Sequence, residues 1–279
     1  MRRLWMGVAL ILMAHAAFAA VQYEFIQTSR SDADGMPPMN MSAKAVIDGP
    51  RSRVDFLSGN AYPPGTYVIS TDGARKLRFV DPGQKTYTEV NTMTIASAIG
   101  MNNIKVENLE SSVARLDDQQ MIAGIPTDHY KLSLTFDVTV IFSGRPLRQH
   151  FRAEIDKWTT SRFGDVTSAL ASATLETGNQ QIDELIAAET TKISGFPLKQ
   201  SVRITAMNAL MDKQRPGKSK LSIPTSTTLT REITITSIRE TKGVEEALFA
   251  IPAGYTRAEF AERMPKSQTQ VLTFEPQSD

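Results

Sequence analysis

The sequence predicts a mainly β fold of the α+β kind: a strongly curved antiparallel sheet, or half-open β-barrel, covered by helices. Apolar and polar residues alternate almost without exception through 129–142, and a period of two gives a strand one buried and one solvated face. This run is far longer than the usual strand of about five or six residues, which favours a large curved sheet. Shorter alternating runs, separated by Gly, Pro and Asp, fill much of the remaining chain.

The first half of the chain carries a series of strand signals. Strands are expected at 22–28, 43–56, 66–71, 76–80 and 85–90. An Asp-Gly-Pro sequence at 48–50 interrupts the second run, and an aspartate followed by a glycine suits a tight turn or a bulge. Further Asp-Gly and Asp-Pro-Gly turns separate the last three runs, which should therefore form a meander.

The second half is expected to hold one more strand, a long hairpin and two later strands. The hairpin joins 129–142 to 148–156 through a Ser-Gly-Arg-Pro turn, and the returning strand alternates as well. The other strands are expected at 106–116, 198–207 and 228–239. The basic segment 213–220 is interpreted as a solvated loop.

Helical spacing of apolar residues occurs at 94–101 and at 165–190. Gly178 and Asn179 interrupt the longer segment, and Asn179 can cap its second half. A helix with a single apolar stripe needs a surface to lie on. We expect that surface to be the concave face of the sheet.

The start of the chain has the three parts of a secretory signal peptide. Met1-Arg2-Arg3 is a positive region, 4–13 is an apolar core, and Ala17-Phe18-Ala19 fits a small-x-small cleavage site. We expect cleavage after Ala19, or one residue later. The alternatives are a buried helix or a membrane anchor, but an anchor needs about 20 apolar residues. The predicted organisation is a signal peptide at 1–20, a single domain at 21–260 and a loose tail at 261–279.

The amino-acid composition limits the compartments in which the protein can reside and the classes of partner that it can bind. The chain has no cysteine, so it can carry neither a disulfide nor the lipid-bearing cysteine of a bacterial lipoprotein. Removal of Arg2 and Arg3 leaves 29 basic and 30 acidic residues, a net charge of −1, without the basic excess of nucleic-acid binders. No other stretch is long and apolar enough to span a membrane. We therefore expect a soluble periplasmic protein that is not a lipoprotein and binds no nucleic acid.

No motif in the sequence points to catalysis, a cofactor or a metal. Export leaves His129 and His150, which we interpret as exposed strand residues because neither lies beside a carboxylate at helical spacing. H-E-x-x-H and G-x-S-x-G are absent. The Gly-Lys-Ser run at 217–219 lacks the earlier glycine of a phosphate-binding loop, and Asp-x-Asp-Gly at 32–35 lacks the outer ligands of a calcium loop. We expect no enzyme, with a hydrolase site assembled from distant residues as the third alternative.

Six segments together resemble a family of exported bacterial proteins, the domain of unknown function 4412 (DUF4412). They are 45–55 (AVIDGPRSRVD), 76–87 (KLRFVDPGQKTY), 122–132 (IAGIPTDHYKL), 155–159 (IDKWT), 195–199 (GFPLK) and 249–255 (FAIPAGY). Their order and spacing carry the resemblance. It implies a half-open curved sheet with an apolar concave face, similar to the LolA- and LolB-like lipoprotein carriers and receptors of the outer membrane. The chain has no motif for handing cargo to a partner, so lipoprotein transfer is an analogy only.

Two functions follow as hypotheses. The first is the binding or carriage of a hydrophobic ligand (a lipid, an acyl chain or a lipoprotein) in an apolar concave groove. The groove candidates are Tyr23, Phe25, Ile47, Phe56, Leu77, Phe79, Leu132, Leu134, Phe136 and Trp158. The alternative for this set is a core packed under the 165–190 helix without a cavity, and for Trp158 an ordinary packing position. The second function is that of an envelope structural or signalling protein acting through protein–protein contacts.

Overall fold

The computed structural model describes residues 20–33, 35–91, 105–142, 145–163, 180–208, 226–241 and 243–259. These residues form one sheet of twelve strands, one α-helix and two short 3-10 helices. No helix in these ranges is long and apolar enough to cross a membrane.

The strands follow one another along the chain. Those of the first half are β1 (Ala20–Ser31), β2 (Met39–Asp48), β3 (Arg51–Gly59), β4 (Tyr67–Ser70), β5 (Lys76–Asp81) and β6 (Thr86–Asn91). Those of the second half are β7 (Lys105–Ile122), β8 (Ile125–Phe142), β9 (Arg145–Thr160), β10 (Phe196–Asn208), β11 (Ser226–Thr241) and β12 (Thr256–Arg257). The helices are η2 (Ser161–Phe163), α3 (Gln180–Thr190) and η4 (Glu246–Phe249).

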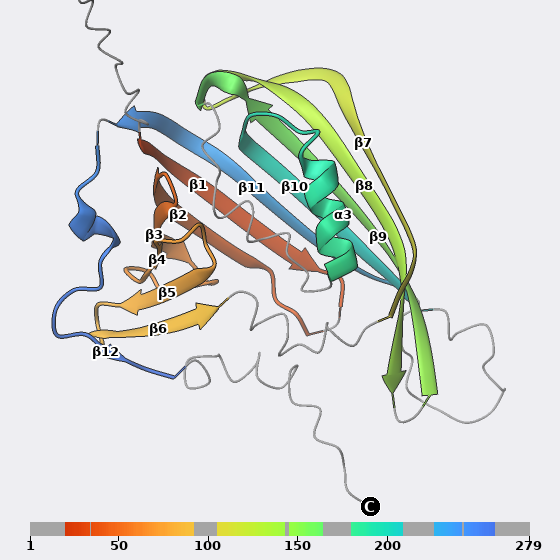
Figure 1. The fold of residues 1–279 in the computed structure, drawn as a ribbon, viewed down its shortest axis with the longest axis horizontal. Coiled ribbons are helices and arrows are strands. Elements are labelled where there is room, and N and C mark those ends of the chain that lie inside the picture. Colours follow the sequence, from red (N-terminus) through yellow and green to blue (C-terminus); the bar gives the residue numbers. More distant parts are fainter. Residues whose placement is uncertain are drawn as a thin grey trace, which may run out of the picture.

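Two antiparallel meanders make up the sheet, whose strand order is β12-β6-β5-β4-β3-β2-β1-β11-β10-β9-β8-β7. The first meander runs from β1 to β6 and the second from β7 to β11. They meet where β1 pairs antiparallel with β11, and Figure 1 shows these two strands side by side in red and blue. The short β12 is added parallel to β6. The two outermost strands do not pair with each other, so the sheet is open and curved.

The structure confirms the mainly β, curved antiparallel sheet, and every predicted strand coincides with an observed one. The hairpin strands are longer than expected, since β8 begins at Ile125 and β9 extends to Thr160. The predicted break at 48–50 is also confirmed. Gly49 there has a φ of +57°, a conformation that glycine adopts without the steric cost of a Cβ.

The structure does not support the prediction that helices cover the sheet. The segment at 180–190 is helical, but 94–101 and 165–179 lie outside the described residues, as do the signal segment 1–19, the basic loop 213–220 and the tail from 261. In the part of the chain that the structure describes, one helix of 11 residues lies over part of the second meander (Figure 1). Three helical turns are too short to cover the face of so wide a sheet.

Buried apolar side chains form three clusters. The large cluster consists of Val21, Tyr23, Phe25, Met41, Ala43, Ala45, Ile47, Val54, Phe56, Val68, Ile122, Ile125, Trp158, Phe163, Phe196, Leu198 and Ile235. The helix cluster joins α3 to β8, β9 and β10 and consists of Leu132, Leu134, Ala153, Ile155, Ile182, Ile186 and Val202. The edge cluster consists of Tyr67, Ile69 and Val80.

The segment 243–257 fastens the edge of the first meander. Ile251 and Tyr255 pack against the edge cluster. Arg53 Nη1 donates a hydrogen bond of 3.2 Å to the Leu248 carbonyl, and the Arg51 guanidinium lies 4.9 Å from the centre of the Phe249 ring. The two-residue β12 then covers the free side of β6, and so short an edge strand offers little for another chain to pair with.

Candidate ligand-binding face

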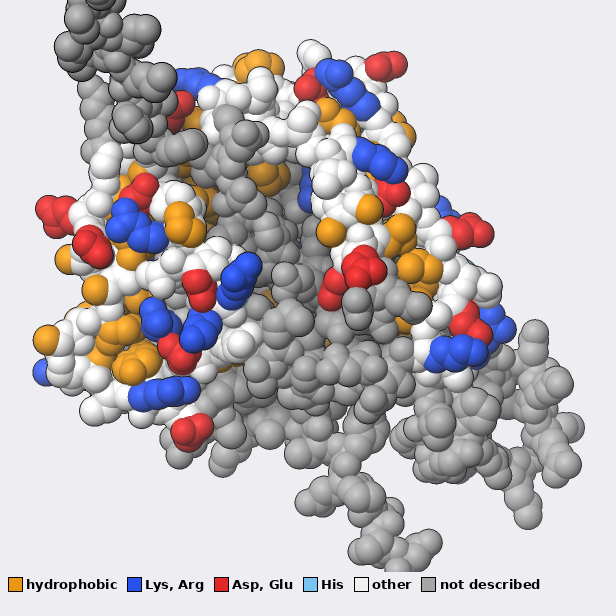
Figure 2. All heavy atoms as spheres, in the orientation of Figure 1, with side chains coloured by type: hydrophobic (Ala, Val, Ile, Leu, Met, Phe, Trp, Pro, Cys, Tyr) orange, Lys and Arg blue, Asp and Glu red, His pale blue; other side chains and the backbone are white. Residues whose placement is uncertain are grey.

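The large cluster and the helix cluster meet on one face of the sheet, which we term the inner face because α3 packs on it. Gln200 and Val202 lie two residues apart on β10 and therefore share a face, and Val202 belongs to the helix cluster. Gln200 pairs in register with Ile233 of β11, which packs against the large cluster. An apolar face thus continues from one meander to the other. Figure 2 shows hydrophobic side chains on both halves of the sheet.

The structure divides the ten predicted groove residues between these two clusters. Five are buried in the large cluster: Tyr23, Phe25, Ile47, Phe56 and Trp158. Two pack against it while half-buried: Leu77 and Phe79. Three belong to or pack against the helix cluster: Leu132, Leu134 and Phe136. Apart from Trp158, the sequence therefore selected residues from both halves of one apolar face, and not a single compact group.

Trp158 has different surroundings from the other nine. Its ring stacks on the His129 imidazole with 4.2 Å between centroids, and Lys199 Nζ lies 4.8 Å from the ring centre. Because Trp158 follows Lys157 on β9, the two side chains point to opposite faces of the strand. The buried Nε1 of Trp158 has no hydrogen-bond partner. This packing fits the alternative of an ordinary core position for Trp158.

The interpretation of the histidines as exposed was wrong for His129, which is only 5% exposed. Its Nδ1 lies 2.7 Å from an Asp118 carboxylate oxygen and its Nε2 lies 3.0 Å from Asp156. His150 is half-buried, with Nδ1 2.8 Å from Asp137. These carboxylates come from neighbouring strands, so helical spacing in the sequence could not have revealed them.

Asp137 is the centre of a polar cluster on the outer face, the face opposite α3. Its carboxylate accepts hydrogen bonds of 2.6 Å from Asn108 and Arg148 and of 2.8 Å from His150. The hydrogen bonds from Asn108, His150 and Arg148, in that order of importance, hold the pKa of Asp137 at about 2. Nearby, Glu154 forms ion pairs of 3.2 and 3.0 Å with basic residues of β8 and β9. The outer face of this hairpin is therefore charged and well paired.

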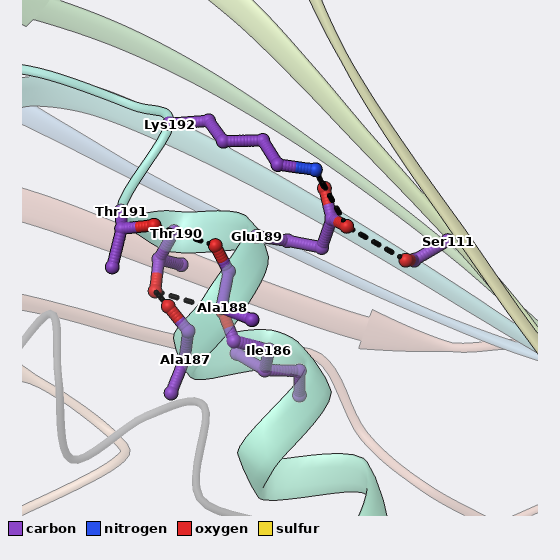
Figure 3. Close-up of polar contacts among 8 residues, drawn as sticks. All are labelled: Ser111, Ile186, Ala187, Ala188, Glu189, Thr190, Thr191 and Lys192. Atoms are coloured by element: carbon purple, nitrogen blue, oxygen red, sulfur yellow. Dashed lines mark hydrogen bonds and ion pairs between the residues drawn. The ribbon is translucent and has the colours of Figure 1, made fainter.

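The helix α3 is held to β7 by polar contacts at its C-terminal end (Figure 3). Ser111 of β7 donates a hydrogen bond of 3.0 Å to Glu189, and Lys192 Nζ lies 2.8 Å from the same carboxylate. The contact with Lys192, followed by that with Ser111, lowers the pKa of Glu189. The Thr191 hydroxyl donates to the Ala188 carbonyl at 2.6 Å, which satisfies one of the groups that helix ends leave without a partner. The end of the helix is thus fixed over the second meander.

A loop after β3 brings Tyr62 onto the inner face. Gly59, at a φ of +115°, lies so close to the backbone at Asn40 that a side chain would collide with it. The Tyr62 ring stacks on Phe56 with 4.2 Å between centroids and lies 6.1 Å from Phe79. Burial raises the pKa of the Tyr62 phenol, and the positive charge of Arg231 partly opposes this rise. Tyr62 therefore connects the aromatic wall of the large cluster to β11.

Three polar residues occupy the region where the two apolar clusters meet, and we refer to Lys157, Gln200 and Arg231 as the polar trio. Lys157 and Gln200 are paired in register across β9 and β10. Arg231 pairs with Val202, the next inner-face residue of β10. Strand spacings of about 4.8 Å and steps of about 3.3 Å per residue place the Cα atoms of Lys157 and Arg231 about 12 Å apart. Long side chains at these positions can approach the same point above Gln200.

Lys157 and Gln200 are buried, Arg231 is half-buried, and none of their side-chain nitrogens has a described partner. Lys157 is 7% exposed and Gln200 is 4% exposed. No hydrogen bond or ion pair joins the charged groups of Lys157 and Arg231 to any residue that the structure describes, and Gln200 Nε2 is buried without a partner. Burial lowers the pKa of Lys157. Burial also lowers the pKa of Arg231, and the phenol of Tyr62 partly opposes that shift. Such groups are costly to bury without compensation.

The sequence reading missed the polar trio, although a signal for it exists. Lys157 continues the inner-face alternation of Ala153 and Ile155, but the predicted strand ended at Asp156. Gln200 lies in the same phase as Val202, and Arg231 in the same phase as Ile233. A polar residue in the apolar phase of a strand was the available sign. In the described ranges, no group of three or more His, Cys, Asp or Glu residues could hold a metal ion.

No family model and no curated protein matches the sequence. Among solved structures, the chain is similar to a LolA superfamily protein from Nitrosomonas europaea, at 10% identity and a TM-score of 0.29, over 84% of this chain and 90% of that one. It is also similar to a structure described as lipid–protein interactions in lipovitellin, at 8% identity and a TM-score of 0.28, over 82% of this chain and 26% of that one. TM-scores this low carry no argument about function, and the predicted DUF4412 membership gains no support.

Proposed function

We propose that this protein is exported to the periplasm and there binds a hydrophobic ligand with an acyl chain on the inner face of its sheet, without catalysing a reaction. One observation carries the proposal. An apolar face continues across both meanders, whereas α3 packs on the helix cluster alone among the described residues. Ligand sites are lined mainly by hydrophobic and aromatic side chains of this kind.

The shape and lining of this face suit a long apolar molecule. The sheet is open along its length, so a ligand can lie across the strands where β10, β11 and β1 adjoin. Tyr62, Phe56 and Phe79 form an aromatic wall on one side, and α3 borders the other. Ligand sites are concave and mostly apolar, with a few polar groups that orient the ligand.

The test starts from protein purified out of the periplasmic fraction without detergent. Native mass spectrometry should detect a co-purifying lipid or acyl compound. After delipidation, the protein should bind a neutral fluorescent acyl probe with an increase in fluorescence. The substitution Phe79→Ser, on the aromatic wall, should weaken probe binding, whereas Arg152→Ser on the outer face should not. A folded protein with no bound lipid and no probe binding would overturn the proposal.

The competing function, an envelope protein acting through protein–protein contacts, would need an outer surface with unsatisfied groups. The outer face of β8 and β9 instead has its charges paired, as shown by the hydrogen bonds to Asp137 and the ion pairs to Glu154. Crosslinking in cells that captures one dominant protein partner, with no lipid on the purified protein, would favour this function over ligand binding.

A further inference from the structure

We infer that the ligand is an anionic amphiphile, whose carboxylate or phosphate head group is bound by the polar trio of Lys157, Gln200 and Arg231 while its chain lies on the apolar inner face. This inference rests on the proposed function and specifies its ligand class. It adds to that function a site for a negative charge, placed between the two apolar clusters.

The first argument is chemical complementarity. Lysine and arginine donate hydrogen bonds and accept none, and the free atom of Gln200 is its donor Nε2. All three groups of the trio therefore lack the same thing, an acceptor. A carboxylate or phosphate supplies several acceptor lone pairs together with a negative charge, and hydrogen bonds between charged partners are the strong ones.

The second argument is that no described acceptor forms a hydrogen bond or ion pair with the two cationic side chains. Burial is the only cause that shifts the pKa of Lys157, and the group that acts on Arg231 besides burial is the phenol of Tyr62. Elsewhere the described chain pairs its bases readily: Lys199, next to Gln200 in sequence, reaches Glu232 on the outer face at 3.7 Å. The inner face therefore holds two cationic side chains whose positive charges no described residue compensates.

The third argument is position. The trio does not lie at the rim of the sheet but where the two clusters adjoin, since Gln200 is flanked on β10 by Leu198 of the large cluster and Val202 of the helix cluster. A head group held there leaves its chain in contact with apolar side chains in either direction. A small free anion would leave this apolar surface uncovered, which favours an amphiphile.

The test compares ligands that share a chain and differ in head group. Displacement of the neutral acyl probe from the delipidated protein is measured with tetradecanoate, tetradecyl phosphate and tetradecan-1-ol. We expect the two anions to bind at least about tenfold more tightly than the alcohol, the size of effect that one charge-assisted contact produces. Lys157→Met and Arg231→Met should each remove most of that preference and leave the alcohol's affinity unchanged. Lys199→Met, an equal change on the outer face, should preserve the preference.

The outcomes separate this inference from the proposed function. Equal binding of alcohol and anions, unaffected by Lys157→Met, would overturn the head-group site and leave acyl binding standing. Failure of the probe and of all three ligands to bind would overturn the proposed function itself. Displacement by inorganic phosphate at the same concentration as tetradecyl phosphate would overturn the amphiphile and identify a small-anion site. Far-UV circular dichroism and urea unfolding of each variant establish that the compared proteins are folded.

Discussion

Replacement of Lys157 by methionine should make the protein more stable, which is the opposite of what most substitutions of buried residues do. The residue is buried, with 7% of its surface exposed, and its ammonium group has no partner among the described residues. Methionine has a similar length and keeps the apolar contacts of the lysine stem. The substitution therefore removes an uncompensated polar group and little else. Relief of one such group is worth about 1–3 kcal/mol.

The gain should be measurable and should depend on pH. For a domain of this size, each kcal/mol raises Tm by roughly 2–4 °C. Burial lowers the pKa of Lys157 from its ordinary value of 10.5, so the folded protein binds fewer protons than the unfolded chain between the two pKa values. Stability of the unsubstituted protein must then rise with pH across that window. The advantage of the methionine variant should be full below the folded pKa and should shrink as the pH rises towards 10.5.

Urea unfolding of ligand-free protein, followed by tryptophan fluorescence at several pH values, measures this difference. Lys199→Met is the matched control, because it removes the same charge one strand away on the outer face, where Glu232 is its partner at 3.7 Å. The ion pair of this half-buried lysine is worth at most about 1 kcal/mol, and its contact with the Trp158 ring adds a similar amount at most, so the control should be destabilising by a small amount. A Lys157→Met variant less stable than the unsubstituted protein would refute the reasoning, since it would mean that Lys157 has a structural partner.

Three other predictions concern the frame around the site, and a fourth concerns export. Asp137→Asn should cost about 2 kcal/mol of unfolding free energy at neutral pH and should flatten the acid limb of the stability profile. The pKa of this carboxyl falls from 3.8 in the unfolded chain to about 2 in the folded protein. The carboxylate therefore stabilises the fold above pH 3.8, and this contribution is lost as the pH falls towards 2. Leu132→Ala, at a position with no exposed surface, should lower the unfolding free energy by about 2–5 kcal/mol in urea, and an effect below 1 kcal/mol would contradict its place in the core. Gly59→Ala should cost about 1–3 kcal/mol through backbone strain and weaken probe binding by displacing Tyr62. N-terminal sequencing of the exported protein should begin at Ala20, the first residue of β1, and a start at Met1 in the periplasm would refute the signal peptide.

The strands were predictable because one face of each strand is mainly apolar and the other is mainly polar. Alternation along 129–142 reports which side chains meet solvent, and this depends on local sequence alone. The pairing of β1 with β11 was not predictable in this way, since no local pattern records which distant strand lies alongside. The sequence therefore predicted the strands, one short meander, the long hairpin and a curved sheet, but not the seam between β1 and β11 that joins the two halves.

The candidate site shows the same difference between features set by local sequence and features set by strand pairing. The apolar residues were found from their phase, as with Phe25 and Leu134. Lys157 shares that phase but was left out, because the predicted strand ended at Asp156, whereas β9 continues to Thr160. The partners of His129 lie on neighbouring strands, so their approach depends on register. Contacts between side chains on neighbouring strands depend on strand register, which the local sequence pattern does not record.

The seam between β1 and β11 has a consequence for how the molecule is assembled. Gln22 and Arg239, hydrogen-bonded across it, are 217 residues apart in the chain, whereas every other antiparallel pair of the sheet joins strands that follow one another. Because long-range pairing must overcome the entropy of closing a long loop, we expect the two meanders to form first and the seam last. Lys157, Gln200 and Arg231 all belong to the later meander, while Phe56, Tyr62 and Phe79 belong to the earlier one. The half that would recognise a charge and the half that supplies the aromatic wall thus become one surface only at the final step of folding.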